Sequence, residues 1–127
     1  MDLALWISAW VLAGVALVGG VSKSFVPKEK LAAVHGGGWT EGVGARSIKA
    51  LGVLELLAAV GLVLPGLLGR VAVLVPVTAG CWVLLMVGAM VTHGRRREFG
   101  FVGLNLAYLA LAAFIAWGRF GPESFPG

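Results

Sequence analysis

Four long apolar stretches separated by short polar segments dominate the hydrophobic pattern of the chain. They cover approximately residues 3–24, 46–64, 71–93 and 101–118. About 20 helical residues span the ~30 Å hydrocarbon core of a bilayer, and a helix satisfies its own backbone hydrogen bonds there. The pattern therefore predicts an all-α integral membrane four-helix bundle, in which residues 1–127 form a single transmembrane domain.

Composition excludes a water-soluble domain. Of the 127 residues, 59% are hydrophobic and 13% are charged, whereas soluble domains carry about 25% charged residues. The net charge of +4 comes from cations near the ends of the apolar stretches, where they orient helices and contact anionic lipid headgroups. We therefore expect a lipid bilayer, and no nucleic acid, as a partner. The lone cysteine, Cys81, cannot form an internal disulfide or a thiolate metal cluster.

Positive charge is distributed unequally between the two ends of the predicted bundle. Eight lysines and arginines fall at the end that carries the first and third connections, and two, Arg70 and Arg119, fall at the other. The positive-inside rule then predicts a multi-pass protein of the plasma membrane with both termini outside. The first stretch is preceded by Asp2 and no cation, so we expect it to remain as a helix rather than be cleaved as a signal peptide.

The connections carry the helix-breaking residues. In the longest one, residues 25–45, we expect a short amphipathic element on the membrane surface at Lys28–His35, followed by a turn at the glycines 36–38. The second helix is expected to end at Pro65. Pro76 falls in the first two turns of the third helix, where a membrane helix tolerates proline.

Glu55 stands in the middle of the second apolar stretch. A carboxylate in hydrocarbon is costly unless it is paired, protonated or facing water, and it marks a candidate functional site. Gly52 and Ala59 share its helix face, and their small size allows another helix to approach. Lys49 and Arg46 lie ~120° and ~180° away around the helix. The partner of Glu55 must therefore be another helix, water or a ligand.

Further polar side chains fall at a similar depth in the other predicted helices. Lys23 ends the first helix, His93 ends the third, and Asn105 and Tyr108 share a face of the fourth. If the polar faces turn inward, these groups and the buried carboxylate surround one pocket in the cytoplasmic half of the bilayer. Each also has a structural interpretation: Lys23 can extend to the interface, and Asn105 can bond a neighbouring helix.

A stripe of large side chains, Trp82, Met86, Met90 and His93, follows one side of the third helix. Such a stripe is more often packing than a cofactor site. Met86 nevertheless falls at the depth of the predicted pocket and is a candidate ligand-binding residue. Both methionines lie on the same side of the helix as His93, so neither can be the second axial ligand of a haem held by that histidine.

Three sequence blocks resemble the DoxX-like family of small membrane proteins. They are GVLE at 52–55, MVGAMVTH at 86–93 and WGRF at 117–120, with Asn105 between the last two. The resemblance covers most of the chain and implies a four-helix membrane bundle. Relatives in that family include the membrane subunit of an archaeal thiosulfate:quinone oxidoreductase and proteins associated with bacterial redox defence.

The resemblance also implies a set of polar site residues. The family's recurring polar positions correspond to Arg46, Glu55, His93 and Asn105; Lys23 and Tyr108 are added from spacing alone. Our leading hypothesis is a redox-associated protein that binds a quinone or similar apolar small molecule. These side chains and Met86 would contact the ligand, and Glu55 and His93 would be the catalytic residues that handle protons. The chain has no thiolate cluster and no dinucleotide motif. Electrons would therefore come from a soluble or membrane redox partner.

Two alternatives stay open from the sequence. The first is a self-contained membrane enzyme, an isomerase or hydrolase of an apolar substrate, with Glu55 as general acid or base and a haem held by His93; without haem we expect no metal. The second is a non-catalytic scaffold in which the polar groups hold the bundle together. In every case the small size and the 20 glycines favour a homo-oligomer or association with another chain.

Overall fold

The computed structural model describes residues 2–33 and 37–125, and within them it contains helices and no strands. The elements in chain order are α1 (Asp2–Phe25), α2 (Lys28–Ala33), the 3₁₀ helix η1 (Gly38–Gly42), α3 (Ala45–Leu68), α4 (Leu74–Arg95) and α5 (Phe99–Phe120). Among the described residues, four helices, α1, α3, α4 and α5, are long and apolar enough to cross a membrane, with mean hydropathies of 2.0 to 2.2. The prediction of an all-α membrane bundle is confirmed.

Two helix ends differ from the sequence prediction, both near prolines. Helix α3 does not end at Pro65 but continues to Leu68, and Gly69 then ends it in a left-handed conformation with φ 64°. Helix α4 begins three residues later than expected, because Val71 has a positive φ of 50° that cannot belong to a right-handed helix. Pro76 therefore lies in the first turn, where its missing N–H has no intrahelical partner to lose.

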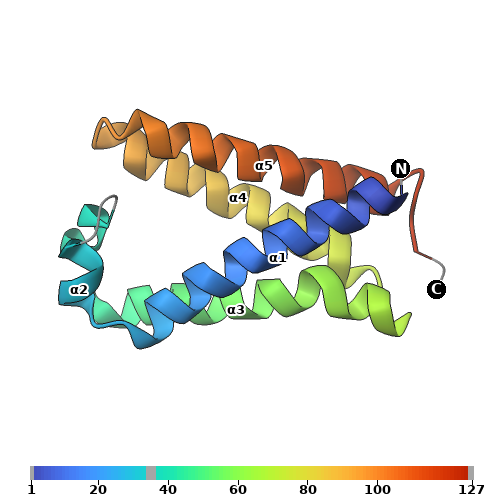
Figure 1. Ribbon diagram of the computed structural model, residues 1–127, viewed down its shortest axis with the longest axis horizontal. Helices are drawn as coiled ribbons and strands as arrows, with labels where there is room; N and C mark the ends of the chain where they lie inside the picture. Colours follow the sequence, from blue (N-terminus) through green and yellow to red (C-terminus); the bar gives the residue numbers. More distant parts are fainter. Residues whose placement is uncertain (1, 34–36, 126–127) are drawn as a thin grey trace.

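The four long helices form two closely packed pairs (Figure 1). Helix α1 packs most extensively on α3, and α4 packs on α5, while the contacts between the pairs are fewer. Glycines allow the first pair to approach closely: a Cβ on Gly20 would lie 2.9 Å from the Gly52 carbonyl oxygen, and one on Gly52 would lie 2.8 Å from the Ser24 nitrogen. The expectation that Gly52 admits a neighbouring helix is confirmed. Gly14, in contrast, has no atom within 4 Å of such a Cβ.

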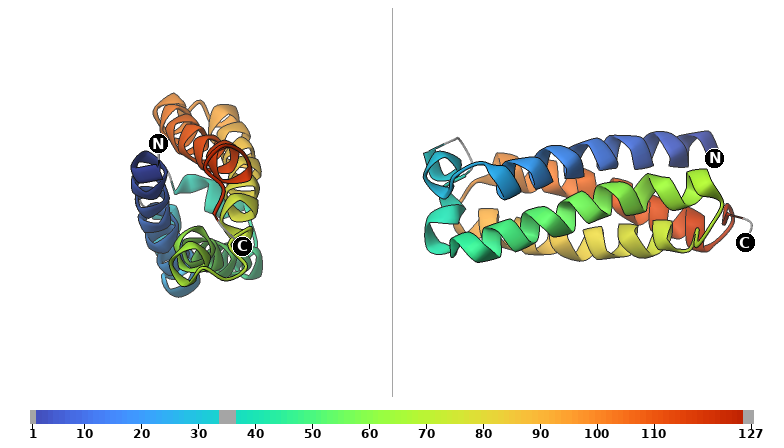
Figure 2. Two further views of the ribbon diagram at one scale, coloured as in Figure 1. Left: turned by 90° about the vertical axis from the view of Figure 1, so that its right-hand side faces the viewer. Right: turned by 90° about the horizontal axis from the view of Figure 1, so that it is seen from below.

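The apolar core fills the half of the bundle nearer the two termini. Its fully buried side chains come from all four long helices and include Leu12, Leu62, Val75 and Ile115. Both termini and the α3–α4 connection lie at this end (Figure 1). At the opposite end the two pairs diverge, and α2 with η1 lies across the bundle, as the end-on view in Figure 2 shows. The core therefore closes one end of the bundle, and two short helices cover the other.

The short helices occupy the connection predicted to be amphipathic. Helix α2 forms over Lys28–Ala33, within the predicted element, while residues 34–36, including His35, lie outside the described part of the chain. Gly37 and Gly38 lead into η1, where the Thr40 hydroxyl donates a hydrogen bond to the Gly37 carbonyl at 2.7 Å. This connection therefore places Trp39 over the diverging end of the bundle.

Candidate functional site

Glu55 forms an ion pair with Lys23 of the neighbouring helix. The Nζ–Oε2 distance is 2.9 Å, and the exposed fractions of the two side chains are 20% for Lys23 and 7% for Glu55. The partner of the carboxylate thus comes from α1, as the angular positions on α3 required. Arg46 and Lys49, on the same helix as Glu55, are exposed.

The ion pair fits because position 19 has no side chain. A Cβ on Gly19 would lie 2.9 Å from Glu55 Oε1 and 3.3 Å from Lys23 Nζ. Gly19 and Lys23 of α1 are one turn apart and therefore share a face of that helix. That face carries both the cation and the space for the carboxylate.

A cavity of about 460 Å³ adjoins the ion pair and is lined by all four long helices and by η1. Its polar lining residues are Lys23, Glu55, Thr92, His93, Asn105 and Tyr108, and its largest apolar ones include Trp39, Trp82 and Met86. Trp82 and Met86 also belong to the apolar core. The cavity therefore begins where the core ends and extends toward the short helices.

Two N–H donors among the lining residues lack hydrogen-bond partners within the described chain. They are the indole Nε1 of Trp82 and the amide Nδ2 of Asn105. A buried donor without a partner costs free energy, typically about 1–3 kcal/mol. An occupant with acceptor oxygens would remove that cost. The site is thus a mostly apolar cavity with two unused donors and an ion pair.

His93 lies at the end of α4 in a second polar cluster. Its Nδ1 is 2.9 Å from Glu98 Oε1, and its ring stacks on Phe101 with centroids 5.2 Å apart. Because a carboxylate only accepts, Nδ1 is the donor, which leaves Nε2 to exchange a proton. The hydrogen bond from His93 and the nearby Arg96 guanidinium hold the pKa of Glu98 below its ordinary value, against a smaller opposing effect of burial.

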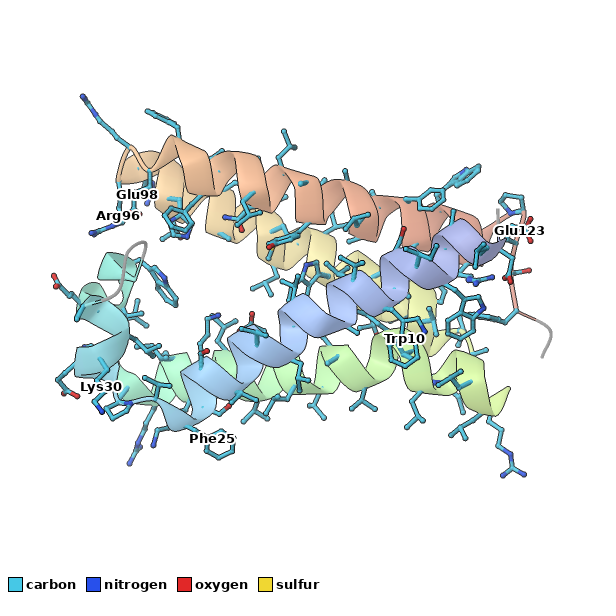
Figure 3. The ribbon with its side chains drawn as sticks, in the orientation of Figure 1. Trp10, Phe25, Lys30, Arg96, Glu98 and Glu123 are labelled. Carbon is cyan, nitrogen blue, oxygen red and sulfur yellow. The ribbon has the colours of Figure 1, made fainter. Side chains whose placement is uncertain are left out.

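Arg96 connects this cluster to the short helices. Its Nε lies 3.3 Å from Glu98 Oε1, and a Cβ on Gly38 of η1 would collide with its guanidinium. Figure 3 shows Arg96 and Glu98 at the α4–α5 turn, on the side that faces η1. Neither charged residue lines the cavity, but Glu98 contacts the lining residue His93, and Arg96 contacts Gly38, which precedes the lining residue Trp39. The end of the cavity near η1 is therefore flanked by charged groups.

The structure brings together most of the residues predicted from the sequence. Those that line the one cavity are Lys23, Glu55, Met86, His93, Asn105 and Tyr108. Arg46 does not line it, because its side chain is exposed at the start of α3. The described residues contain no group of three His, Cys, Asp or Glu side chains arranged to hold a metal ion.

Three contributors were not identified from the sequence. Trp39 lies in the long connection between α1 and α3, whose path no periodicity could give. Trp82 was assigned to packing, which is true of its ring, although its indole N–H reaches the site unpaired. Glu98 follows His93 by five residues, beyond the end of the helix. The one sequence feature that could have indicated its contact with His93 is its negative charge next to three arginines in RRREFG.

Comparison with known proteins gives a family assignment. The family model described as the DoxX-like family matches residues 7–115. A search of curated proteins and a search of solved structures found no significant match. The family match covers all of α3 and α4 and most of α1 and α5, including the ion pair and both unpaired donors. The chain therefore belongs to the DoxX-like family.

Proposed function

We propose that this membrane protein binds a quinone or a similar apolar small molecule with carbonyl oxygens in the cavity between its four long helices. The observation that carries the proposal is the pair of unpaired N–H donors, Trp82 Nε1 and Asn105 Nδ2, in an otherwise apolar lining. Carbonyl oxygens accept hydrogen bonds and carry no charge, which matches such donors. A volume of about 460 Å³ falls within the range of small-molecule sites.

The titratable groups of the cavity fit redox chemistry on such a ligand. Reduction of a quinone to a quinol takes up two protons. Glu55 with Lys23, and His93 with Glu98, provide two acid–base pairs from different helices. We assign the delivery of protons to Glu55 and His93, and the orientation of the ligand to Asn105, Tyr108 and Trp82.

Electrons must come from outside the chain in this proposal. The described residues provide no metal-binding cluster, and the sequence has one cysteine and no dinucleotide motif. We therefore propose that the protein acts with a soluble or membrane redox partner, as part of a quinone-linked oxidoreductase system. The charged border formed by Arg96 and Glu98 at the α4–α5 turn is the part of the site nearest such a partner.

The test is binding of a water-soluble, tailless benzoquinone to the purified full chain, measured by isothermal titration calorimetry. We expect the protein to bind it and the variant Asn105→Leu to bind it about two- to tenfold more weakly, because a lost hydrogen bond to a ligand costs about 0.5–1.5 kcal/mol. The control is Glu29→Gln, a substitution at an exposed position on α2 outside the cavity, which should bind the quinone like the unmodified protein.

The competing scaffold interpretation predicts a different result. If Asn105→Leu and Glu55→Gln change the thermal stability of the purified protein but neither the protein nor the variants bind quinone, the polar groups serve the bundle alone. Binding with equal affinity in the protein and in Asn105→Leu would contradict the assigned contact. The isomerase or hydrolase and haem alternatives gain no specific support from the described geometry.

A further inference from the structure

We infer that the ligand enters the cavity sideways from the bilayer, between α3 and α4, and that its apolar chain stays in a groove there while its polar ring occupies the cavity. The inference rests on the proposed function and narrows the ligand class. It assigns the site to an amphiphile with a carbonyl-bearing ring and a long alkyl or isoprenoid chain, rather than to a compact water-soluble molecule.

The groove is a separate hollow of about 390 Å³ on the membrane-facing side of α3 and α4. Apolar side chains provide most of its lining, among them Leu54, Leu57, Ala58 and Val77. Leu54 and Leu57 are 62% and 63% exposed, so in a bilayer they contact lipid. A hydrocarbon chain in this groove would have the same apolar neighbours as in the bilayer.

The groove and the cavity adjoin each other and are separated only by side chains that line both. Leu51, Glu55, Trp82 and Leu85 line both. Two of the four, Glu55 and Trp82, carry polar groups that act on the ligand ring in the proposed function. A molecule whose ring contacts Trp82 from the cavity side therefore has the groove as the adjacent space for its substituent.

Helix geometry sets where the passage opens. The contact between Gly61 and Thr78 is tight, because a Cβ on Gly61 would lie 2.6 Å from the Thr78 hydroxyl oxygen. From there α3 and α4 separate toward the end covered by α2 (Figure 1). Moreover, α3 packs less extensively on α4 than on α1. The groove therefore lies on the side of the Gly61–Thr78 contact where α3 and α4 diverge, at the level of Glu55.

Physical chemistry favours this route over entry beneath η1. Each methylene that passes from an apolar environment into water costs free energy, and the end of the cavity near η1 is flanked by the charged side chains of Arg96 and Glu98. A chain that stays in the bilayer avoids that cost, because lipid tails and leucine side chains are equally apolar. Only the ring then has to move from lipid into the cavity.

The experiment uses the full chain in phosphatidylcholine vesicles and a benzoquinone with a two-unit isoprenoid chain that carries a diazirine at its far end. After illumination, mass spectrometry locates the cross-links. We expect them in the peptides of α3 and α4 that border the groove, including the exposed Cys81. Cross-links confined to α1, α5 or the short helices would overturn the inference.

A blocking variant provides an independent test. Leu57→Trp fills the groove at an exposed position, so we expect normal folding and about tenfold weaker binding of the tailed quinone. Val60→Trp is the matched control, since Val60 is 53% exposed on the same helix and lines a different groove, against α1. The tailless quinone should bind both variants like the unmodified protein, because it needs no groove.

The outcomes separate the two proposals. If the tailless quinone binds but Leu57→Trp and Val60→Trp affect the tailed one equally, the lateral groove is wrong and the cavity function stands. If neither quinone binds the unmodified protein, the proposed function itself fails. If a correctly folded Leu57→Trp protein no longer bound the tailless quinone, the inference would also be overturned, because the groove would then not be specific to the isoprenoid chain of the ligand.

Discussion

Gly19 of α1 lies directly against the carboxylate of Glu55 on α3, so that a Cβ at position 19 would stand 2.9 Å from Oε1. Real side-chain carbons do not approach oxygen so closely, and one of the two groups would have to move. Because the contact is with the far end of a flexible side chain, the carboxylate would move more readily than the helices. The absence of a side chain at Gly19 thus sets where Glu55 points.

Gly19→Ala should therefore disturb the site while leaving the fold intact. We expect the free energy of unfolding of the variant to lie within about 1 kcal/mol of that of the unmodified protein. Alanine stabilises the helix by up to ~1 kcal/mol relative to glycine, and the disturbed ion pair offsets part of that gain. Affinity for the tailless quinone should fall severalfold. Gly14→Ala, where a Cβ meets no atom within 4 Å, is the control. Equal affinities in the two variants would show that the carboxylate position does not matter for binding.

Removing the cation of the ion pair should be more costly than removing both charges. Lys23→Met leaves a carboxylate of which 7% is exposed without its partner, and breaking such a buried pair costs up to about 3–5 kcal/mol. In the double variant Lys23→Met, Glu55→Gln, we expect part of that loss to be recovered, because no uncompensated charge remains. Thermal unfolding in mild detergent measures all four proteins of the cycle. Additive effects of the two substitutions would exclude coupling between the side chains.

The His93–Glu98 pair gives the protein a specific sensitivity to acid. The pKa of Glu98 is lowered from its ordinary value of 4.5, chiefly by the hydrogen bond from His93. A group whose pKa is lower in the folded state contributes stability above its unfolded pKa and loses it as the pH falls through its folded pKa. We therefore expect the melting temperature to fall below pH 4.5. In Glu98→Gln, which cannot titrate, this part of the fall should be absent, and an unchanged acid profile would contradict the assignment.

The sequence was sufficient for the architecture because the hydrophobic pattern alone gives four membrane-length helices. It also placed the pocket, since Glu55 had no partner on its own helix and Lys23, His93 and Asn105 fell at a similar depth. It failed at Pro65, where a helix surrounded by apolar neighbours continues through a residue that ends helices in water. The α3–α4 groove was equally hidden, because the divergence of two helices depends on where the tight contact at Gly61 falls.

Arg46 and Arg119 illustrate the other limit of reasoning from charge. The sequence counts both as cations near helix ends, and it also predicts Arg46 as a ligand-binding residue; the side chain of Arg46 is exposed and does not line the cavity. Arg119, however, has a side chain that is 3% exposed. Its burial depends on Trp6 and Phe125, which are far apart in sequence and whose rings meet at 5.5 Å. No local pattern could have indicated that contact.

Arg119 should accordingly be the arginine whose loss destabilises the bundle most. Its Nη1 donates to Asp2 Oδ1 at 2.8 Å and to the Glu123 carbonyl at 2.9 Å, and its guanidinium lies 3.9 Å from the Phe125 ring centroid. The hydrogen bond to the Glu123 carbonyl contributes about 1.5–3 kcal/mol and the contact with the Phe125 ring about 0.5–1 kcal/mol, so we expect Arg119→Leu to lower the free energy of unfolding by about 2–4 kcal/mol.

Substitution by lysine distinguishes geometry from charge at this position. Arg119→Lys keeps the cation but loses the planar group that stacks on Phe125 while bonding two acceptors, so it should recover less than half of the lost stability. Asp2 is 61% exposed, and exposed ion pairs contribute little; Asp2→Asn should therefore have a small effect. Denaturation of the three variants in the same detergent makes the comparison. Full recovery by lysine would mean that charge alone, rather than the stacked guanidinium, holds the closed end of the bundle together.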